Sequence, residues 1–336
     1  MRKTIAFALA VALTVAAISY TVTAQARSRL ETVAARGRLI CGVSGATPGF
    51  SFPDPASGRM TGFDADFCTA VAAYIDVPSV EFVNLTSANR IPAVTAGSVD
   101  VVFRTTTVTV SRNEQVDFGP VTFYDGQRLL VKTGSNIRGL DNLNGARICV
   151  HAGTTSEKNI GDQLRNRNFR FQLITFAEAA QAFQGLVAGR CDVFTTDASQ
   201  LTAFRATAPN PADFQLVGRE FSDEPLAPMY QQNDSRWAAA VNWTVWGLIL
   251  AEELGVTQAV ANNPSRISEI SGRDPVAKGL LEWNRGAMVR VLKLVGNYGE
   301  IYNRYFGARS RTAITRDGTR NELGKDGGAM TSRPFR

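Results

Sequence analysis

Residues 103–112 read FRTTTVTVSR and hold the side chains best suited to bind a small anion. They follow two valines, 101–102, which begin a predicted strand. A carboxylate needs hydroxyl groups, backbone N–H groups and a guanidinium that can bind both of its oxygens. Thr105, Thr107 and Arg112 supply such groups at the end of this strand. The alternative is a solvated threonine-rich turn, since threonine is also common in strands.

A second polar segment complements the first. Residues 153–157 read GTTSE after another predicted strand, and Thr154 and Glu157 have the spacing of a capping box. This motif opens a helix whose first N–H groups can bind an anion, with Thr155 in its first turn. Farther along, Asp197 ends the strand-like run FTTD. The first segment offers the cation Arg112, and the run that ends at Asp197 offers an anion, so a zwitterion fits between them.

The usual enzyme signatures are absent from the sequence. It contains no G-x-S-x-G, H-E-x-x-H, G-x-x-x-x-G-K-[ST] or G-x-G-x-x-G motif. A serine-histidine-aspartate triad would need His151, the single histidine, which is more simply a rim or satisfied loop residue. With one histidine and no CxxC, a zinc site has almost no ligands. We therefore expect no catalytic residues, no metal and no cofactor.

The elements that must position these residues occur twice in the chain. Ile40-Cys41 resembles Ile148-Cys149, and the pattern Ala-Gly-x-x-Asp-Val occurs at 96–101 and 188–193. In each copy the glycine ends a predicted helix and the valine begins a strand. Two strand-helix-strand units predict an α/β protein with mainly parallel sheets, whose ligands lie at the carboxyl ends of the strands.

The repeat also predicts two lobes with a cleft between them. We place lobe 1 at 27–124 and 230–307 and lobe 2 at 125–229, with chain crossings near 124–126 and 225–229 that form a hinge. In lobe 1, an amphipathic helix after Gly62 carries a core stripe of aromatic residues. A long helix over 237–254 and a final helix over 292–306 complete the prediction.

The four cysteines predict disulfides. An even count in an oxidising compartment favours stapling over metal binding, and three connectivities are possible. The order along the chain favours pairs within each lobe, namely Cys41 with Cys68 and Cys149 with Cys191.

The N-terminus predicts export. Residues 1–20 read MRKTIAFALAVALTVAAISY, a basic start followed by an apolar run, and small residues before position 27 suit cleavage. We assign 1–26 as a secretory signal peptide and expect a periplasmic mature protein. The alternative is an uncleaved membrane anchor, because the apolar run approaches the length that spans a bilayer.

The positive charge lies at the C-terminus. The chain has a formal net charge of +6, and residues 308–336 hold seven basic and three acidic residues. This basic, glycine-rich tail lacks interleaved aromatic residues, which argues against nucleic-acid binding. We expect the tail to be a solvated, partly disordered end.

These features together resemble the periplasmic solute-binding proteins of polar amino-acid ABC importers, family 3, and especially the general L-amino-acid-binding branch. The resemblance covers nearly all of the chain to Gly307 and is carried by the segments CGVSGATPGFSFPD, GFDADFCTAVAA, TTTVTVSRNEQVDFGPVTFYDGQ, ICVHAGTTSE, AGRCDVFTTDAS, EPLAPMYQ, AEELGVTQ and VGNYGEIYNRYFG. It implies a periplasmic binding protein type II fold, closure on one L-amino acid and delivery to a membrane permease, with the monomer as the default state.

The resemblance also implies roles for individual residues. The ligand carboxylate is held by Arg112, Thr107 and Thr105 from one lobe and by Thr154 and Thr155 from the other, and the α-ammonium is received by the residue that matches the family's strand-end carboxylate, Asp197. The loop after the first strand contributes Ser44 and the aromatic position Phe50. Arg104 either favours acidic ligands or points away from the site. An enzyme of the cyclohexadienyl dehydratase type and a ligand sensor without transport are the alternatives on this scaffold.

Overall fold

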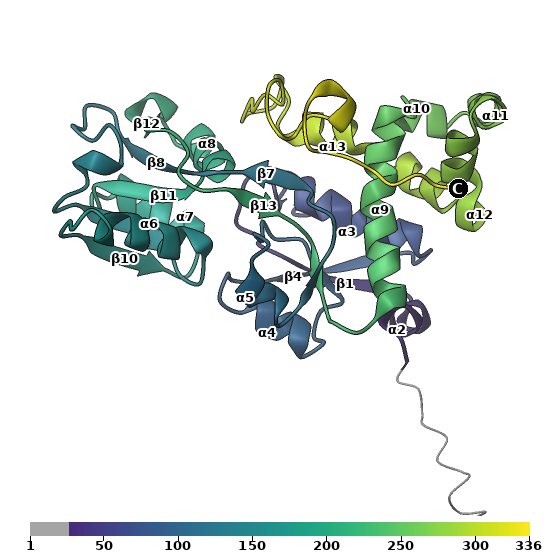
Figure 1. The fold of residues 1–336 in the computed structure, drawn as a ribbon, viewed down its shortest axis with the longest axis horizontal. Helices are drawn as coiled ribbons and strands as arrows, with labels where there is room; N and C mark the ends of the chain where they lie inside the picture. The colour runs from purple at the N-terminus through teal and green to yellow at the C-terminus, as the bar shows by residue number, and fades with distance from the viewer. Residues whose placement is uncertain (1–26) are drawn as a thin grey trace, which may run out of the picture.

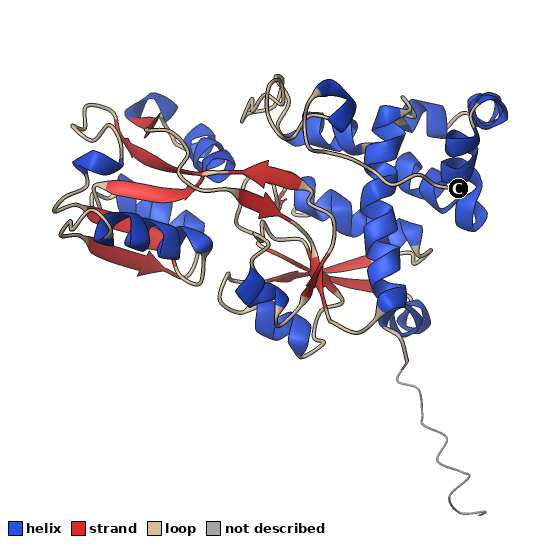
Figure 2. Ribbon diagram, viewed as in Figure 1, coloured by secondary structure: helices blue, strands red, loops and turns tan. Residues whose placement is uncertain are grey.

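The computed structural model describes residues 27–336, and the assigned signal peptide, 1–26, lies outside the described residues. The described chain folds into two α/β lobes that are joined by a pair of strands (Figures 1 and 2). This is the predicted fold class. The two lobes are built on the same plan, as the sequence repeat indicates.

The sheet of lobe 1 has the strand order β4-β1-β5-β14-β6. Strands β4, β1 and β5 run parallel, and β14 is antiparallel to β5 and β6. The strands in this order are Val80–Asn84, Leu39–Val43, Val101–Val102, Met229–Tyr230 and Asp117–Phe118. Met229, which the sequence reading assigned to lobe 2, thus pairs within lobe 1.

The sheet of lobe 2 has the order β10-β9-β11-β8-β12. Strands β10, β9 and β11 are parallel, and β8 runs antiparallel to β11 and β12. These strands are Gln172–Phe176, Arg147–His151, Val193–Asp197, Gln127–Lys132 and Phe214–Val217. Three parallel strands followed by an antiparallel one therefore occur in both lobes.

The repeated Ala-Gly-x-x-Asp-Val pattern has the same physical role in each lobe. Gly97 and Gly189 adopt φ of 69° and 70°, the left-handed conformation that ends a helix and that glycine adopts without steric cost. The aspartate that follows accepts a hydrogen bond from the backbone of the neighbouring parallel strand. Asp100 accepts from Ile40 N at 2.7 Å, and Asp192 accepts from Arg147 N at 2.8 Å.

Helices cover both sheets. Lobe 2 carries α6 (Thr155–Arg165), α7 (Ala179–Val187) and α8 (Ala198–Thr207). Lobe 1 carries the helices α2 (Arg29–Arg36), α3 (Phe63–Tyr74), α4 (Arg90–Thr95), α5 (Val110–Asn113), α9 (Ser235–Glu253), α10 (Gln258–Ala261), α11 (Pro264–Arg273), α12 (Pro275–Val295) and α13 (Tyr298–Tyr305). Shorter elements are β2 (Phe52–Pro53), β3 (Met60–Thr61), η1 (Leu140–Asn142), η2 (Pro211–Asp213) and η3 (Gly324–Asp326).

The final helix predicted over 292–306 is wrong, because the chain breaks it in two. Gly296 has φ of 79° and follows the end of α12. Asn297 then starts α13 with a capping box, in which its side chain accepts from Glu300 N and the Glu300 carboxylate accepts from Asn297 N. The new cap satisfies N–H groups that an uninterrupted helix would have paired internally.

The hinge consists of β7 (Phe123–Asp125) and β13 (Glu224–Leu226), which pair antiparallel with Tyr124 opposite Pro225. Both crossings lie within or next to the segments predicted for them. Two strands that connect two rigid lobes allow the lobes to rotate against each other.

Both disulfides form as the order along the chain favoured. Cys41 in β1 is bonded to Cys68 in α3, and Cys149 in β9 is bonded to Cys191, which precedes β11. Each bond therefore fastens a strand to another element of its own lobe. Cross-links of this kind stabilise a fold by restricting the unfolded chain.

The expectation of a solvated C-terminal tail is wrong. Residues 308–336 pack along lobe 1, and the yellow end of the chain crosses α9 and finishes beside α12 (Figure 1). Leu323, Met330 and Phe335 are buried and join the core of that lobe. The Phe335 ring packs edge-on against Trp243 of α9, with ring centroids 4.8 Å apart. The tail was misjudged because its few apolar residues are spaced among glycines and charges.

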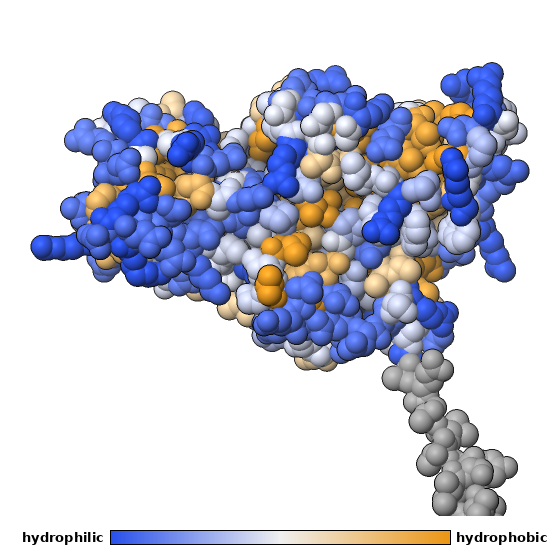
Figure 3. All heavy atoms as spheres, in the orientation of Figure 1, coloured by the Kyte–Doolittle hydropathy of each residue, from blue (hydrophilic) through white to orange (hydrophobic). Residues whose placement is uncertain are grey.

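The surface differs between the lobes. In the view of Figure 3, hydrophilic side chains cover most of lobe 2, whereas hydrophobic side chains reach the surface over lobe 1. Among the helices of residues 27–336, none combines the length and the hydrophobicity that crossing a bilayer requires.

Candidate functional site

The carboxyl ends of the parallel strands in the two lobes meet at a polar site between them. Arg104 of lobe 1 forms an ion pair with Glu178 of lobe 2, with Nη2 and Oε2 3.3 Å apart. The hydroxyl oxygens of Thr107 and Thr155 also meet across the lobes at 3.3 Å. The structure therefore has the lobes in contact, in a closed arrangement.

The threonine segment of lobe 1 is held in a constrained conformation. Thr105 has φ of 40°, a left-handed value that is strained for a residue other than glycine. Its N–H donates to the Asp64 carboxylate at 3.2 Å. Burial raises the pKa of Asp64 to about 7, against the opposing effects of this hydrogen bond and of Arg104. The N-terminus of α3 thus fixes the turn that follows β5.

Arg112 presents an available guanidinium to this site. Its backbone N–H is capped by the Thr109 hydroxyl at 3.3 Å, and its Nη1 donates to the Thr107 carbonyl at 2.8 Å. Within residues 27–336, its other guanidinium nitrogens make no hydrogen bond. Burial lowers the pKa of Arg112, while the charges of Glu224 and Asp197 raise it. Arg112 is buried and has hydrogen-bond donors to spare.

The predicted helix start in lobe 2 is present at α6. Thr154 is the N-cap, and its hydroxyl accepts from Glu157 N at 3.1 Å and donates to the His151 carbonyl at 2.8 Å. Glu157 accepts from Gly153 N at 2.9 Å, one residue before the position that a capping box uses. Thr155 occupies the first turn, next to the contact between the lobes.

Asp197 ends β11 and is buried. Its carboxylate accepts from Gln200 Nε2 at 2.8 Å. Burial raises the pKa of Asp197 well above its ordinary value, and the nearby charges of Asp125 and Glu224 raise it further, whereas Arg90 and the Gln200 hydrogen bond lower it. A buried carboxylate in this condition gains from an arriving cation, which would favour its ionised form.

Glu224 connects the two lobes and was missed by the sequence reading. It is buried at the start of β13, and its carboxylate accepts four hydrogen bonds from side chains. The donors and distances are Thr107 at 2.6 Å, Thr155 at 2.9 Å, Asn159 at 2.8 Å and Ser222 at 2.7 Å. The only signal in the sequence was an acidic residue at the start of the otherwise apolar hinge strand.

A cluster of positive charge surrounds the same site. Arg90, at the start of α4, and Arg104 are buried with Arg112. Arg104 is engaged by Leu85 O, Ser87 Oγ and Glu178. Arg104 therefore points into the contact between the lobes, where its carboxylate partner is Glu178 of the protein itself.

Among residues 27–336, two polar atoms beside this cluster, Arg90 Nε and His151 Nδ1, are buried and have no hydrogen-bond partner. Burial lowers the pKa of His151 well below its ordinary value, and the charges of Arg104, Arg90 and Arg112 lower it further. The imidazole is thus neutral at physiological pH. The interpretation of His151 as a rim or satisfied histidine is wrong, because the ring is buried and lacks a partner for Nδ1.

The two residues predicted to bind ligand from the loop after β1, Ser44 and Phe50, lie in different surroundings. Ser44 is buried directly after β1, and its hydroxyl hydrogen-bonds with Thr47 Oγ1 at 2.8 Å. The Phe50 ring lies in the aromatic core of lobe 1, with centroid distances of 4.8 Å to Phe306 and 5.5 Å to Phe123. Phe50 is therefore a core residue, and the expectation that it contacts ligand is corrected.

Known proteins with similar sequences and structures share a common function class. The model for bacterial extracellular solute-binding proteins, family 3, matches residues 39–308. The general L-amino acid-binding periplasmic protein AapJ of Rhizobium johnstonii is 37% identical over 98% of both chains. The glutamate/glutamine/aspartate/asparagine-binding protein BztA of Rhodobacter capsulatus is 37% identical, over 93% of this chain and 95% of that protein.

A solved structure extends the comparison to the fold. A periplasmic binding protein of an ABC transporter from Brucella ovis, with glutathione bound, is 35% identical to this chain. The two superpose with a TM-score of 0.84 over 92% of this chain and 100% of that one. The family model ends at residue 308, before most of the tail.

Proposed function

This chain belongs to family 3 of the bacterial extracellular solute-binding proteins, and we propose that it binds one L-amino acid between its lobes as the periplasmic component of an ABC importer. The observation that carries the proposal is the pairing of opposite charges across the site. Arg112 of lobe 1 and Asp197 of lobe 2 are both buried, and they lie close enough for the charge of Asp197 to raise the pKa of Arg112. A zwitterion is the simplest ligand that satisfies both.

The ligand carboxylate binds Arg112 and the groups around it. The free nitrogens of the guanidinium can donate two parallel hydrogen bonds to a carboxylate, at charge-assisted strength. We assign Thr105, Thr107 and Ser44 to the lobe 1 side of this subsite, because they follow the carboxyl ends of β5 and β1. From lobe 2, the first turn of α6, with Thr154 and Thr155, adds backbone N–H groups and the positive end of the helix dipole.

The ligand ammonium binds Asp197. In the ligand-free protein, the charge of this carboxylate is disfavoured by burial and by the neighbouring carboxylates Asp125 and Glu224. An ammonium group removes that penalty, because an opposite charge within hydrogen-bonding distance favours the ionised carboxylate. The resulting pair is shielded from water once the lobes close, which strengthens it.

The side chain of the ligand faces Arg90 and His151. Their unpartnered Nε and Nδ1 atoms are buried polar groups, and leaving such groups unsatisfied costs about 1–3 kcal/mol each. A ligand with oxygen or amide groups in its side chain would satisfy them. The names of two relatives, a general L-amino-acid-binding protein and a glutamate/glutamine/aspartate/asparagine-binding protein, support a polar amino acid.

Closure is the event that a membrane permease recognises. Glu224 accepts hydrogen bonds from Thr107 of lobe 1 and from Thr155 and Asn159 of lobe 2, so its full set of partners forms only when the lobes meet. We place the mature protein in the periplasm as a monomer that delivers its ligand to the permease.

A thermal-shift panel on the mature protein, unfolded and refolded to remove carried ligand, tests this function. At a concentration 100 times its Kd, a ligand stabilises the fold by about 2.7 kcal/mol and raises Tm by roughly 5 °C. We expect such shifts with several L-amino acids and none with D-enantiomers, keto acids or sugars. Absence of a shift with every L-amino acid, or conversion of an added cyclic dienyl acid, would overturn the proposal.

A further inference from the structure

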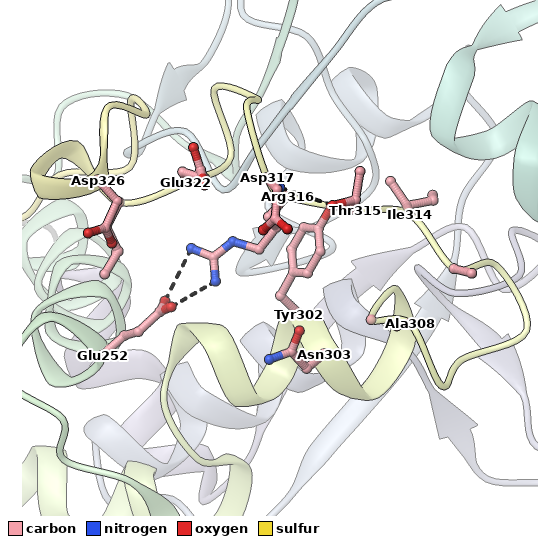
Figure 4. Close-up of a pocket in the computed structure, with 13 residues that line it drawn as sticks. Glu252, Tyr302, Asn303, Ala308, Ile314, Thr315, Arg316, Asp317, Glu322 and Asp326 are labelled. Atoms are coloured by element: carbon pink, nitrogen blue, oxygen red, sulfur yellow. Dashed lines mark hydrogen bonds and ion pairs between the residues drawn. The ribbon is translucent and has the colours of Figure 1, made fainter.

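The segment 316–321 of the C-terminal tail contacts hinge strand β7 and the residue before β13, and it is anchored on lobe 1. It begins at Arg316, whose Nη1 forms an ion pair with Glu252 of α9 at 2.7 Å (Figure 4). The guanidinium also lies 5.1 Å and 5.2 Å from the ring centroids of Tyr298 and Tyr302. Arg316 Nε donates to the Asn321 carbonyl at 2.8 Å, which closes the segment into a loop. We call residues 316–321 the strap.

The anchor lies within a lined pocket rather than on open surface. Figure 4 shows Arg316 reaching Glu252 beside the Tyr302 ring, with Glu322 and Asp326 around it. The side chains of Arg316 and Glu252 are 13% and 20% exposed. Partial burial of this kind makes the pair stronger than a fully solvated one. One end of the strap is thus held firmly to lobe 1.

The other end of the strap grips the backbone of the hinge. The Asn321 side chain accepts from Tyr124 N at 2.7 Å and donates to Tyr124 O at 2.8 Å. Asn321 is buried, with 5% of its surface exposed. Tyr124 lies opposite Pro225, whose nitrogen carries no hydrogen and whose carbonyl accepts from Val108 N at 2.9 Å. The N–H and the C=O of Tyr124 both bond the Asn321 amide, which takes the place of a further strand at this edge of the hinge.

Arg320 contacts the hinge at a second point. Its guanidinium carbon lies 3.9 Å from the centroid of the Tyr124 ring, and Nη1 forms an ion pair with Asp223 at 2.5 Å. Asp223 directly precedes β13, on the lobe 2 side of the second crossing. Through Arg320 and Asn321, the strap thus reaches β7 and the segment that enters β13.

These contacts fit the hinge angle of the closed arrangement. A hinge moves by changing the backbone torsions of a few residues in the connecting strands. The Asn321 amide bonds both the N–H and the C=O of Tyr124, so its two hydrogen bonds fit one setting of the Tyr124 torsions. The ion pair of Arg320 with Asp223 likewise joins the anchored tail to a residue that moves with lobe 2.

We propose that the strap sets the balance between open and closed forms, with Arg320 and Asn321 acting as positioning residues that favour closure. This proposal rests on the proposed function, in which the lobes close when the ligand binds. Apparent affinity equals the intrinsic affinity multiplied by the fraction of protein in the binding-competent form, so a strap that favours closure raises affinity without touching the ligand.

The test compares variants of the refolded mature chain by single-molecule FRET and by titration with the tightest-binding L-amino acid of the panel. Dyes are attached through non-canonical residues placed at two exposed positions, Arg59 in lobe 1 and Arg190 in lobe 2, so that the disulfides stay intact. The variants are N321A, R320A and D223N, together with the double variant R320A/D223N. The control is R309A, which removes an exposed arginine of the same tail.

We expect N321A to shift both ligand-free and ligand-bound distributions toward open distances and to raise Kd by about tenfold, since it removes two hydrogen bonds to buried groups. R320A and D223N should each raise Kd measurably relative to R309A but by no more than about threefold, because the pair is exposed, and the double variant should add nothing further. No rise in Kd and no shift in distance in either variant would count against the strap. R309A should leave both readouts unchanged.

Unchanged distances and Kd in N321A, with or without a lower Tm, would overturn the proposal and make the tail a purely stabilising element. If N321A fails to fold, the R320A and D223N pair decides the question, because both residues lie at the surface. The ligand-free distance distribution does not require a ligand. Failure of every amino acid to bind would therefore contradict the proposed function, while the distances would still test the strap.

Discussion

At the scale of single residues, we expect ligand affinity to depend most on Arg112. Replacement by alanine removes the guanidinium, which is the charged donor proposed for the ligand carboxylate, and leaves that buried carboxylate with neutral hydroxyl and N–H donors alone. We expect R112A to raise Kd by at least about 100-fold, or ~2.7 kcal/mol. Titration of R112A, R112K and the exposed control R59A measures this. A change of less than about twofold in R112A would contradict the role of Arg112.

The fold of R112A must be checked, because Arg112 also donates to the Thr107 carbonyl. R112K keeps a positive charge but loses the planar fork, so its Kd should lie between those of wild type and R112A. A native circular dichroism spectrum for both variants separates lost binding from lost structure.

Asp197 predicts a pH dependence of binding. Burial raises its pKa in the free protein, and the ligand ammonium lowers it, so binding releases a proton at pH values between these two pKa values. Affinity should therefore rise with pH through this window and level off above the raised pKa. Calorimetric titration between pH 5 and pH 8 in buffers of different ionisation enthalpy measures both the affinity and the proton release.

Other ionisable groups lie close to Asp197, so a variant at position 197 is needed to assign the pH dependence. Burial raises the pKa of Asp125 to about 7, so it titrates in the same range, and Glu224 also faces Asp197. Arg90 opposes them, and His151 stays neutral because its pKa is lowered well below the ordinary value. D197N should bind weakly and lose most of the pH dependence. An unaltered slope in D197N would assign the effect to Asp125.

At the scale of elements, the N-terminus of α6 couples stability to binding. T154A removes the cap and its bonds to Glu157 N and the His151 carbonyl, which should lower the free energy of unfolding by about 1 kcal/mol. It should also weaken ligand binding, since the proposed carboxylate subsite includes the first turn of α6. Chemical denaturation and titration measure the two effects.

T154S provides the matched comparison for the cap. Serine keeps the hydroxyl that accepts from Glu157 N, so T154S should recover most of the stability and affinity that T154A loses. Wild-type affinity in T154A, despite a measured loss of stability, would remove α6 from the ligand site.

Elements whose signals are local were predictable from the sequence. The two Ala-Gly-x-x-Asp-Val copies placed a helix end and a strand start in each lobe, because the left-handed glycine and the aspartate act on neighbouring backbone. The same repeat led to the pairing of Cys41 with Cys68 and of Cys149 with Cys191. The break before α13 was also readable, since Asn297 and Glu300 have capping-box spacing, but the apolar run around it suggested one helix.

Features that depend on distant partners could not be predicted. The strap is held by Glu252, Tyr124 and Asp223, none of them near it in sequence. Glu224 has no motif, and its role follows from donors in three separate segments. The placement of Phe50 in the core rests on packing against Phe123 and Phe306, which only the tertiary structure brings together.

At the scale of the whole molecule, closure joins these local features into one event. The lobes meet through the pair of Arg104 with Glu178 and through the Glu224 network, and the proposed ligand site lies between them. The strap is anchored on lobe 1 and contacts the hinge at Tyr124 and Asp223. Each contact is modest by itself, but all of them form in the same closed arrangement, so ligand binding can shift the whole molecule between two states.

The measurement that tests the central claim most directly is isothermal titration of the refolded mature protein with the amino acid that gives the largest thermal shift. The account predicts one ligand per chain and an affinity that falls at least about 100-fold in R112A and strongly in D197N. Saturable binding that both variants leave unchanged would contradict a site between the lobes. Absence of binding by any L-amino acid would contradict the function itself.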